Sequence, residues 1–184
     1  MIKKLGWKIY SRDGGGDENK LRGMSLRLII SISVVLALLS PVSAGEVEKK
    51  VDEFRGTTTY SGKETTIGRF DFRPFIVIDK NGKDSAPFFM FTVSSNSWQY
   101  LKCHTVDLLA NGKAVVLAEV THDGSVHSGG NVFESIGVFL SIDAFKQLAT
   151  AEKAKGRICT EVFEFSREQI ENLKILGTEA GILK

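Results

Sequence analysis

Two Asn-Gly pairs, each lying between apolar segments, constrain the fold of this chain more than any other feature. The first, Asn81-Gly82, separates residues 70–78 from residues 88–93. Asn-Gly is the strongest short-range hairpin signal, because a type I′ turn needs φ > 0 at both central positions. A turn centred there sets Phe75 opposite Phe88 and Phe72 opposite Phe91. Pro74 then marks a bulge or a sheet edge, because proline cannot donate to a strand ladder.

The second pair, Asn111-Gly112, predicts another hairpin, with arms at residues 98–109 and 114–121. A two-residue turn there places Leu108 beside Val115 and His104 beside Glu119. The same register pairs Val106 with Leu117, Lys102 with Thr121, Leu109 with Ala114, Thr105 with Ala118, Cys103 with Val120 and Leu101 with His122. A slip of one residue would invert every face of this hairpin.

Further strands and two helices complete the predicted fold. Strands are expected at residues 57–60, 65–67, 132–140 and 158–165, where β-branched and aromatic residues gather. Ser141 and Ser166 have the pattern of helix N-caps, and Ser166 with Gln169 fits a capping box. Gly177 is the expected stop of the second helix. The chain is therefore predicted to be α+β: an antiparallel meander or sheet followed by strand–helix–strand–helix, with the helices packed on or beside the sheet.

The segment ahead of this domain has the order of a secretory signal. Arg27 precedes an apolar run at residues 28–39, and small residues end it at Ala44. The run is shorter than the ~17–25 residues that a spanning helix needs. We therefore expect residues 24–44 to be a signal peptide cleaved between Ala44 and Gly45. An uncleaved membrane anchor is the alternative.

The rest of the chain divides around this signal peptide. Residues 1–23 are interpreted as an upstream extension, with translation starting at Met24; a long cytoplasmic n-region is the alternative. Residues 45–55 are expected to be a charged, solvated lead-in or a short helix. Residues 56–178 are expected to form a single β-rich domain, and residues 179–184 a tail.

The charge distribution limits the partners of the exported part. Residues 1–44 hold seven Lys or Arg and three Asp or Glu, whereas residues 45–184 hold seventeen and nineteen. The basic excess thus belongs to the leader. Nucleic acid is an unsuitable partner, because its phosphates require a basic patch. After cleavage no stable membrane span is expected, and the location is periplasmic or extracellular.

The three histidines suggest a possible metal or catalytic site. His104, His122 and His127 lie close in sequence, and Glu119 joins them through the predicted hairpin. They match no established ligand spacing, and no His-Glu-x-x-His is present. We interpret His122 and His127 as surface loop residues and His104 as a cross-strand partner of Glu119. No metal site, catalytic residue or cofactor is assigned.

Cys103 and Cys159 are the two cysteines of the chain. Cys103 and His104 cannot pair as a thiol nucleophile and its base, because successive residues of a strand point to opposite faces. An exported domain with two cysteines on predicted strands indicates a structural disulfide. By the same alternation, Trp98 and Tyr100 are expected to point into the core. The alternative is that these aromatic side chains are exposed and stack on a sugar or peptide.

The function expected from these residues is accordingly broad. No set of nucleophile, base and orienting group is recognisable. We expect an exported domain of unknown partner that binds or scaffolds another molecule and is not an enzyme. The alternative is an exported hydrolase or metal-binding protein that uses His104, Glu119, His122 and His127.

Overall fold

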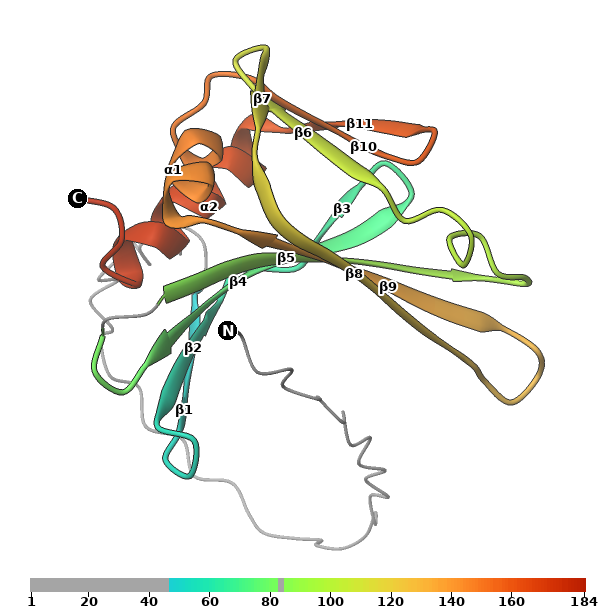
Figure 1. The fold of residues 1–184 in the computed structure, drawn as a ribbon, viewed down its shortest axis with the longest axis horizontal. Coiled ribbons are helices and arrows are strands. Elements are labelled where there is room, and N and C mark those ends of the chain that lie inside the picture. The colour runs from blue at the N-terminus through green and yellow to red at the C-terminus, as the bar shows by residue number, and fades with distance from the viewer. Residues whose placement is uncertain (1–46, 83–84) are drawn as a thin grey trace, which may run out of the picture. The chain divides into compact units, whose positions relative to one another are not determined.

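The structure, a computed structural model, describes residues 47–82 and 85–184 (Figure 1). The predicted leader at residues 1–44 and the cleavage site at Ala44-Gly45 lie outside the described residues. Within the described part of the chain, no helix is long and apolar enough to cross a membrane.

Two antiparallel sheets and two helices make up the described domain. The large sheet has the order β1-β2-β4-β5-β9-β8, with β3 also paired to β4, and the small sheet has the order β11-β10-β6-β7. The strands of the large sheet are β1 (Glu48–Asp52), β2 (Thr57–Ser61), β3 (Thr65–Ile67), β4 (Phe70–Asp79), β5 (Ser85–Ser95), β8 (Leu117–Val126) and β9 (Val132–Leu140). Those of the small sheet are β6 (Val106–Ala110), β7 (Lys113–Val115), β10 (Ala154–Ile158) and β11 (Glu161–Phe165), and the helices are α1 (Ile142–Ala149) and α2 (Arg167–Glu179). The domain is therefore a β-rich α+β fold.

The hairpin predicted around Asn81-Gly82 is confirmed. Phe75 pairs with Phe88 and Phe72 with Phe91 in the β4–β5 ladder. This ladder runs through Pro74 without a break in register. Pro74 faces the gap where β2 has ended and β3 has not begun, and its carbonyl accepts the Gly62 N–H at 2.9 Å. The predicted bulge or sheet edge is therefore absent, since β4 lies inside the sheet, and the missing N–H of Pro74 is tolerated at the gap between β2 and β3.

The second predicted hairpin is correct only near its turn. Leu108 pairs with Val115 and Leu109 with Ala114, but the pairing ends there. Beyond the exposed Val116 the chain leaves the small sheet and enters the large one as β8, which pairs with β9. The opposite arm also ends early, because residues 98–105 form a loop. The pairings predicted farther from the turn, including His104 with Glu119 and Cys103 with Val120, were wrong.

Two further expectations are corrected at the ends of the domain. The charged lead-in at residues 45–55 was expected outside the sheet, but its residues 48–52 form β1, which pairs along its whole length with β2. The strand expected at residues 158–165 is shorter: Ile158 is the last residue of β10, the chain turns at Cys159 with φ 55°, and only Glu161–Phe165 form the predicted strand, as β11. β10 gives a weak strand signal because two of its inward residues, Ala154 and Gly156, have low strand propensity.

The two helices begin where the sequence predicts. The Ser141 and Ser166 side chains accept the Ala144 and Gln169 N–H groups, and Gln169 completes the capping box. Gly177 does not stop α2. It is buried within the helix, where a Cβ would meet Leu183 at 2.6 Å. The chain instead turns at Gly181, with φ 72°.

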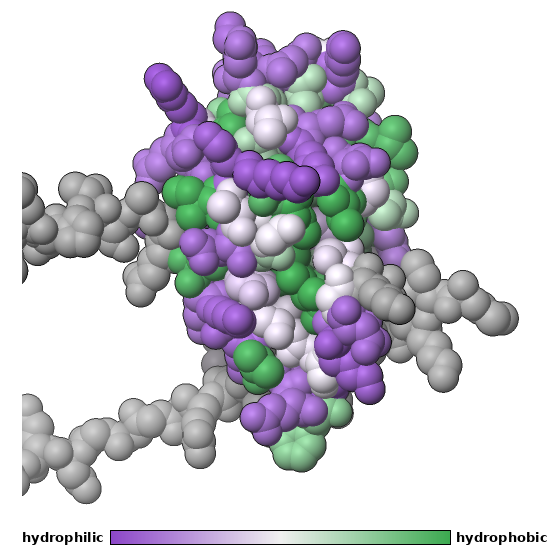
Figure 2. All heavy atoms as spheres, turned by 90° about the vertical axis from the view of Figure 1, so that its left-hand side faces the viewer, coloured by the Kyte–Doolittle hydropathy of each residue, from purple (hydrophilic) through white to green (hydrophobic). Residues whose placement is uncertain are grey.

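One hydrophobic core lies between the large sheet, the helices and the small sheet. Phe89 of β5 packs against Phe145 of α1, and Phe72 of β4 packs edge-on against Phe165 of β11. Both helices and the small sheet cover the same face of the large sheet (Figure 1). Seen from the end where the chain terminates, hydrophobic residues gather in the middle of the domain with hydrophilic residues around them (Figure 2). The opposite face of the large sheet is not part of this core.

Candidate functional site: an aromatic sheet face beside a buried glutamate

Glu134 is a carboxylate buried on the core face of β9, between Val132 and Ile136. Its side chain has no exposed surface. Its Oε2 accepts the Gln99 N–H at 2.7 Å, and its Oε1 accepts the Tyr100 N–H at 2.9 Å. Burial raises the pKa of the Glu134 carboxyl, but these two N–H groups and His122 outweigh it and leave the pKa below its ordinary value. Glu134 therefore anchors the backbone of the loop that spans residues 96–105.

His122 of β8 provides the third partner of this carboxylate. Its Nε2 lies 3.1 Å from Glu134 Oε1, and its ring stacks on the ring of His104 with 5.6 Å between centroids. Trp98 lies edge-on to His122 at 6.4 Å. It also lies over Gly124, where a Cβ would meet the indole at 2.5 Å. The structure thus brings His104 and His122 together, but through a loop and not through the predicted hairpin.

The other two candidates lie elsewhere. Glu119 is three residues from His122 on β8, so the two side chains lie on opposite faces of the strand. His127 lies beyond the end of β8, within 3.2 Å of the Ser125 hydroxyl and edge-on to Phe133. Among residues 47–82 and 85–184, no group of three or more His, Cys, Asp or Glu is placed to hold a metal ion.

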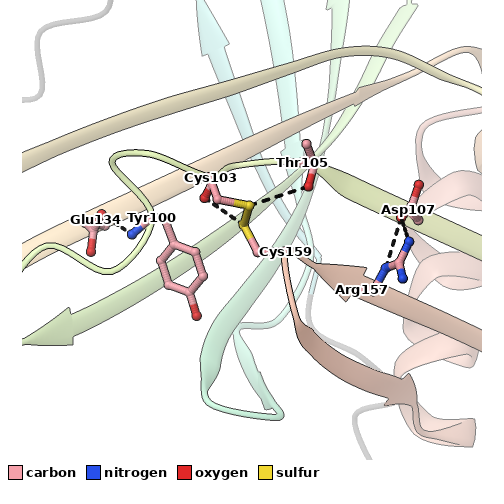
Figure 3. The surroundings of a disulfide bond; sticks show 7 residues. All are labelled: Tyr100, Cys103, Thr105, Asp107, Glu134, Arg157 and Cys159. Carbon is pink, nitrogen blue, oxygen red and sulfur yellow. Dashed lines mark hydrogen bonds and ion pairs between the residues drawn. A yellow bond between two sulfur atoms is a disulfide. The ribbon is translucent and has the colours of Figure 1, made fainter.

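A disulfide joins Cys103 to Cys159, with 5.9 Å between their Cα atoms (Figure 3). Neither cysteine lies on a strand as predicted: Cys103 precedes β6, and Cys159 lies in the turn between β10 and β11. The Cys159 N–H donates to the Thr105 carbonyl at 2.9 Å, which extends the β6–β10 pairing. Next along this pairing, Arg157 and Asp107 form an ion pair at 2.6 Å. The 96–105 loop is thus fixed at one end by Glu134 and at the other by the disulfide.

Tyr100 occupies the interior of this loop. It is 3% exposed, and its ring packs against Phe70 with 5.4 Å between centroids. Burial raises the pKa of its phenol. Trp98, in contrast, is 38% exposed, so the predicted core position holds for Tyr100 and not for Trp98. The loop with its His-Glu pair is therefore a packed structural unit rather than an open pocket.

The second feature is the face of the large sheet opposite the core. Phe75, Phe88 and Phe139 lie side by side on β4, β5 and β9. Their rings are stacked, with centroids 4.8 Å apart for the first pair and 5.4 Å apart for the second. None of the three belongs to the buried core cluster. No described element packs over them, because the helices and the small sheet lie on the other side (Figure 1).

Apolar and small side chains extend this aromatic row along the strands. Val77 and Ala86 lie on one side of it, and Met90 and Gly137 on the other. Gly137 has no side chain to extend the row, and the Thr121 hydroxyl lies over it, 2.6 Å from where a Cβ would be. We call this surface the aromatic face and define it by these residues: Phe75, Val77, Ala86, Phe88, Met90, Gly137 and Phe139.

Sequence reasoning missed both features, although each left a signal. The signal for the aromatic face is that phenylalanines occupy both odd and even positions in one hairpin. Phe72 and Phe75 must therefore point to opposite faces of β4. Glu134 stands in the inward series Val132-Glu134-Ile136-Val138-Leu140, where a charged residue requires partners. The partner of Glu134 on β8 is not visible in the local pattern, because β8 pairs with β9 and not with the strand that precedes Asn111-Gly112.

No protein-family model matches the chain, and comparison with curated proteins and with solved structures found no significant match.

Proposed function

We propose that this protein is a non-enzymatic binding domain that acts outside the cytoplasm and holds an apolar ligand on the aromatic face. The observation that carries the proposal is the row of three stacked phenylalanine rings on a sheet face that no described element covers. A contiguous apolar patch on an otherwise ordinary surface is typical of an interaction site.

The composition of the face favours binding over a purely structural role. A solvated sheet face does not require phenylalanine, because threonine also has high strand propensity. The phenylalanines are therefore not explained by strand formation alone. Phenyl rings also offer a ligand only apolar contact, whereas sugar- and amide-binding sites place a few polar groups among their aromatics. The ligand that fits best is therefore apolar where it lies on the rings.

An extracytoplasmic location is supported by two independent features. The leader at residues 24–44 has the order of a secretory signal. The Cys103–Cys159 disulfide belongs to the kind of bond that forms and persists in oxidising compartments. The His122–Glu134 pair does not favour the alternative of a hydrolase, because its contacts anchor a loop and its carboxylate is fully enclosed.

A neutral apolar dye tests the proposal directly. N-phenyl-1-naphthylamine carries no charge and fluoresces strongly when it enters an apolar site. Titration of the purified protein is expected to give saturable fluorescence. Phe88→Thr removes the central ring and both stacking contacts, so it is expected to weaken dye binding by about tenfold, the equivalent of about 1.4 kcal/mol.

A matched control distinguishes dye binding at the aromatic face from dye binding at any exposed apolar residue. Val162 of β11 is 69% exposed and lies on the small sheet, away from the aromatic face. Val162→Thr is expected to leave dye binding unchanged. Circular dichroism of both variants checks that they fold. Equal dye binding by wild type and folded Phe88→Thr would refute the proposal.

A further inference from the structure

The aromatic row continues across the sheet into a carboxylate at each end. In register, one line of residues crosses six strands in the order Glu48, Ser61, Phe75, Phe88, Phe139, Glu119. Glu48 and Glu119 are thus five strand spacings apart. At about 4.8 Å per spacing the row is about 24 Å long.

Other charges near the row are also mainly acidic. A parallel line runs from Asp71 through Thr92 and Ser135 to Asp123. Among the described residues Asp71 and Glu119 have no ion-pair partner. Two cations share this face: Arg73 lies 5.4 Å from the Phe75 ring centre and 2.9 Å from Glu48, and Lys50 is in register with Val77 through Thr59. A ligand on the rings therefore meets unpaired carboxylates at Glu119 and Asp71, whereas Glu48 at the other end of the row is already paired with Arg73.

This charge pattern discriminates between occupants. A second copy placed face to face would set one predominantly acidic face against another, and like charges across an interface are unfavourable. An anionic membrane surface is disfavoured for the same reason. A ligand with an apolar centre and a basic end complements both the rings and Glu119.

The spacing of the rings indicates the form of such a ligand. An α-helix rises 5.4 Å per turn, so side chains on one face recur at nearly the 4.8 Å and 5.4 Å separations of the three rings. An extended peptide places side chains on one face about 6.6 Å apart, which fits less well. A helix that lies across the strands would set one apolar side chain per turn against successive rings, in the manner of helix-in-groove recognition.

We propose that the ligand of the aromatic face is an amphipathic helical peptide with an apolar stripe and Lys or Arg at the end that lies on Glu119. This inference rests on the proposed function and deepens it. A length of about sixteen residues spans the row at 1.5 Å per residue. The phenylalanines bind the stripe, while Glu119 attracts the basic end.

Three synthetic peptides of about sixteen residues test the inference by calorimetry. All carry the same Leu, Phe and Ala stripe; one has Lys at both ends, the second has Glu at both ends, and the third is the Lys peptide with a central proline that breaks the helix. The Lys peptide is expected to bind about tenfold tighter than the Glu peptide at low salt. High salt is expected to reduce this preference, because exposed charges are screened. The proline peptide is expected to bind at least tenfold more weakly than the Lys peptide.

A charge variant with a matched control locates the effect. Glu119→Gln is expected to weaken the Lys peptide by about two- to fivefold, the range of an exposed ion pair. Glu179→Gln, at the end of α2, removes the same charge elsewhere and is expected to change nothing.

The possible failures are distinguishable. Equal affinity for the Lys and Glu peptides overturns the basic-peptide inference, while retained binding of the neutral dye leaves the proposed function standing. Equal affinity for the proline peptide and the Lys peptide overturns the inference that the ligand binds as a helix. Absence of both peptide and dye binding overturns the inference and the function together. A dimer in light scattering that Phe88→Thr disrupts would assign the face to a second copy instead.

Discussion

At the scale of single residues, Glu134 carries the most demanding interaction in the domain. A buried carboxylate is costly unless hydrogen bonds compensate it. Here two backbone N–H groups and the His122 ring do so, at 2.7, 2.9 and 3.1 Å. Since these donors come from the 96–105 loop and from β8, one side chain of β9 holds three segments of chain together.

Glu134→Gln tests this role. The amide keeps the shape but replaces one acceptor oxygen with a donor, so a backbone N–H that now donates to the carboxylate would face an N–H₂ group. Leaving a buried donor unsatisfied costs about 1–3 kcal/mol. We expect the free energy of unfolding in urea to fall by about that amount. An unchanged unfolding midpoint would show that the loop does not depend on this carboxylate.

The same residue gives the protein a specific acid sensitivity. The folded-state pKa of Glu134 lies below its ordinary value of 4.5, so its contribution to stability is complete above pH 4.5 and is lost as the pH falls below it. The difference in melting temperature between wild type and Glu134→Gln is therefore expected to be largest near neutral pH and to shrink in acid. A difference that stays constant down to the lowest measurable pH would contradict this sign.

At the scale of elements, the disulfide fixes a loop that has little secondary structure of its own. Cys103 and Cys159 are 56 residues apart in sequence. Closing a loop of this length restricts the unfolded chain by about 4 kcal/mol in the chain-entropy model, with measured effects often smaller. The double variant Cys103→Ser, Cys159→Ser is expected to lose about 2–4 kcal/mol of unfolding free energy. Two freely alkylatable thiols in the native protein would contradict the bond itself.

Elements whose signals are local were predicted well from the sequence. Asn81-Gly82 fixed the register of Phe75 with Phe88, because turn chemistry and apolar pattern agree there. Ser141 and Ser166 marked both helix starts, because the capping residues act within one turn. Each of these depends on residues close together in the chain.

Predictions failed where pairing depends on distant segments. At Asn111-Gly112 the turn is correct, but nothing local shows that the chain changes sheets after Val115. Because of this one difference, the sequence predicts Glu119 beside His104 and does not predict the contact of His122 with Glu134. The aromatic face was equally hidden, since Phe139 meets Phe88 only through the β5–β9 pairing.

At the scale of the whole molecule, the leader and the disulfide together predict one observable species. We expect the exported protein to begin at Gly45, with two hydrogens fewer than its reduced sequence. Intact-mass measurement on exported material checks both features at once. A mass that retains residues 28–44 would show that the apolar segment is kept as an anchor.

The large sheet has two apolar faces, and the described domain covers one of them. The helices and the small sheet pack on Phe72, Phe89 and their neighbours, while Phe75, Phe88 and Phe139 lie on the other side. We propose that the second face exists to bind a ligand.

An NMR titration of the isotopically labelled protein with the Lys-ended peptide tests that claim most directly. We predict that amide and ring signals of Phe75, Phe88 and Phe139 shift together and saturate, while signals of Leu109 and Val162 on the small sheet stay in place. Shifts confined to the small sheet or to the 96–105 loop, or no shifts at saturating peptide, would contradict the account.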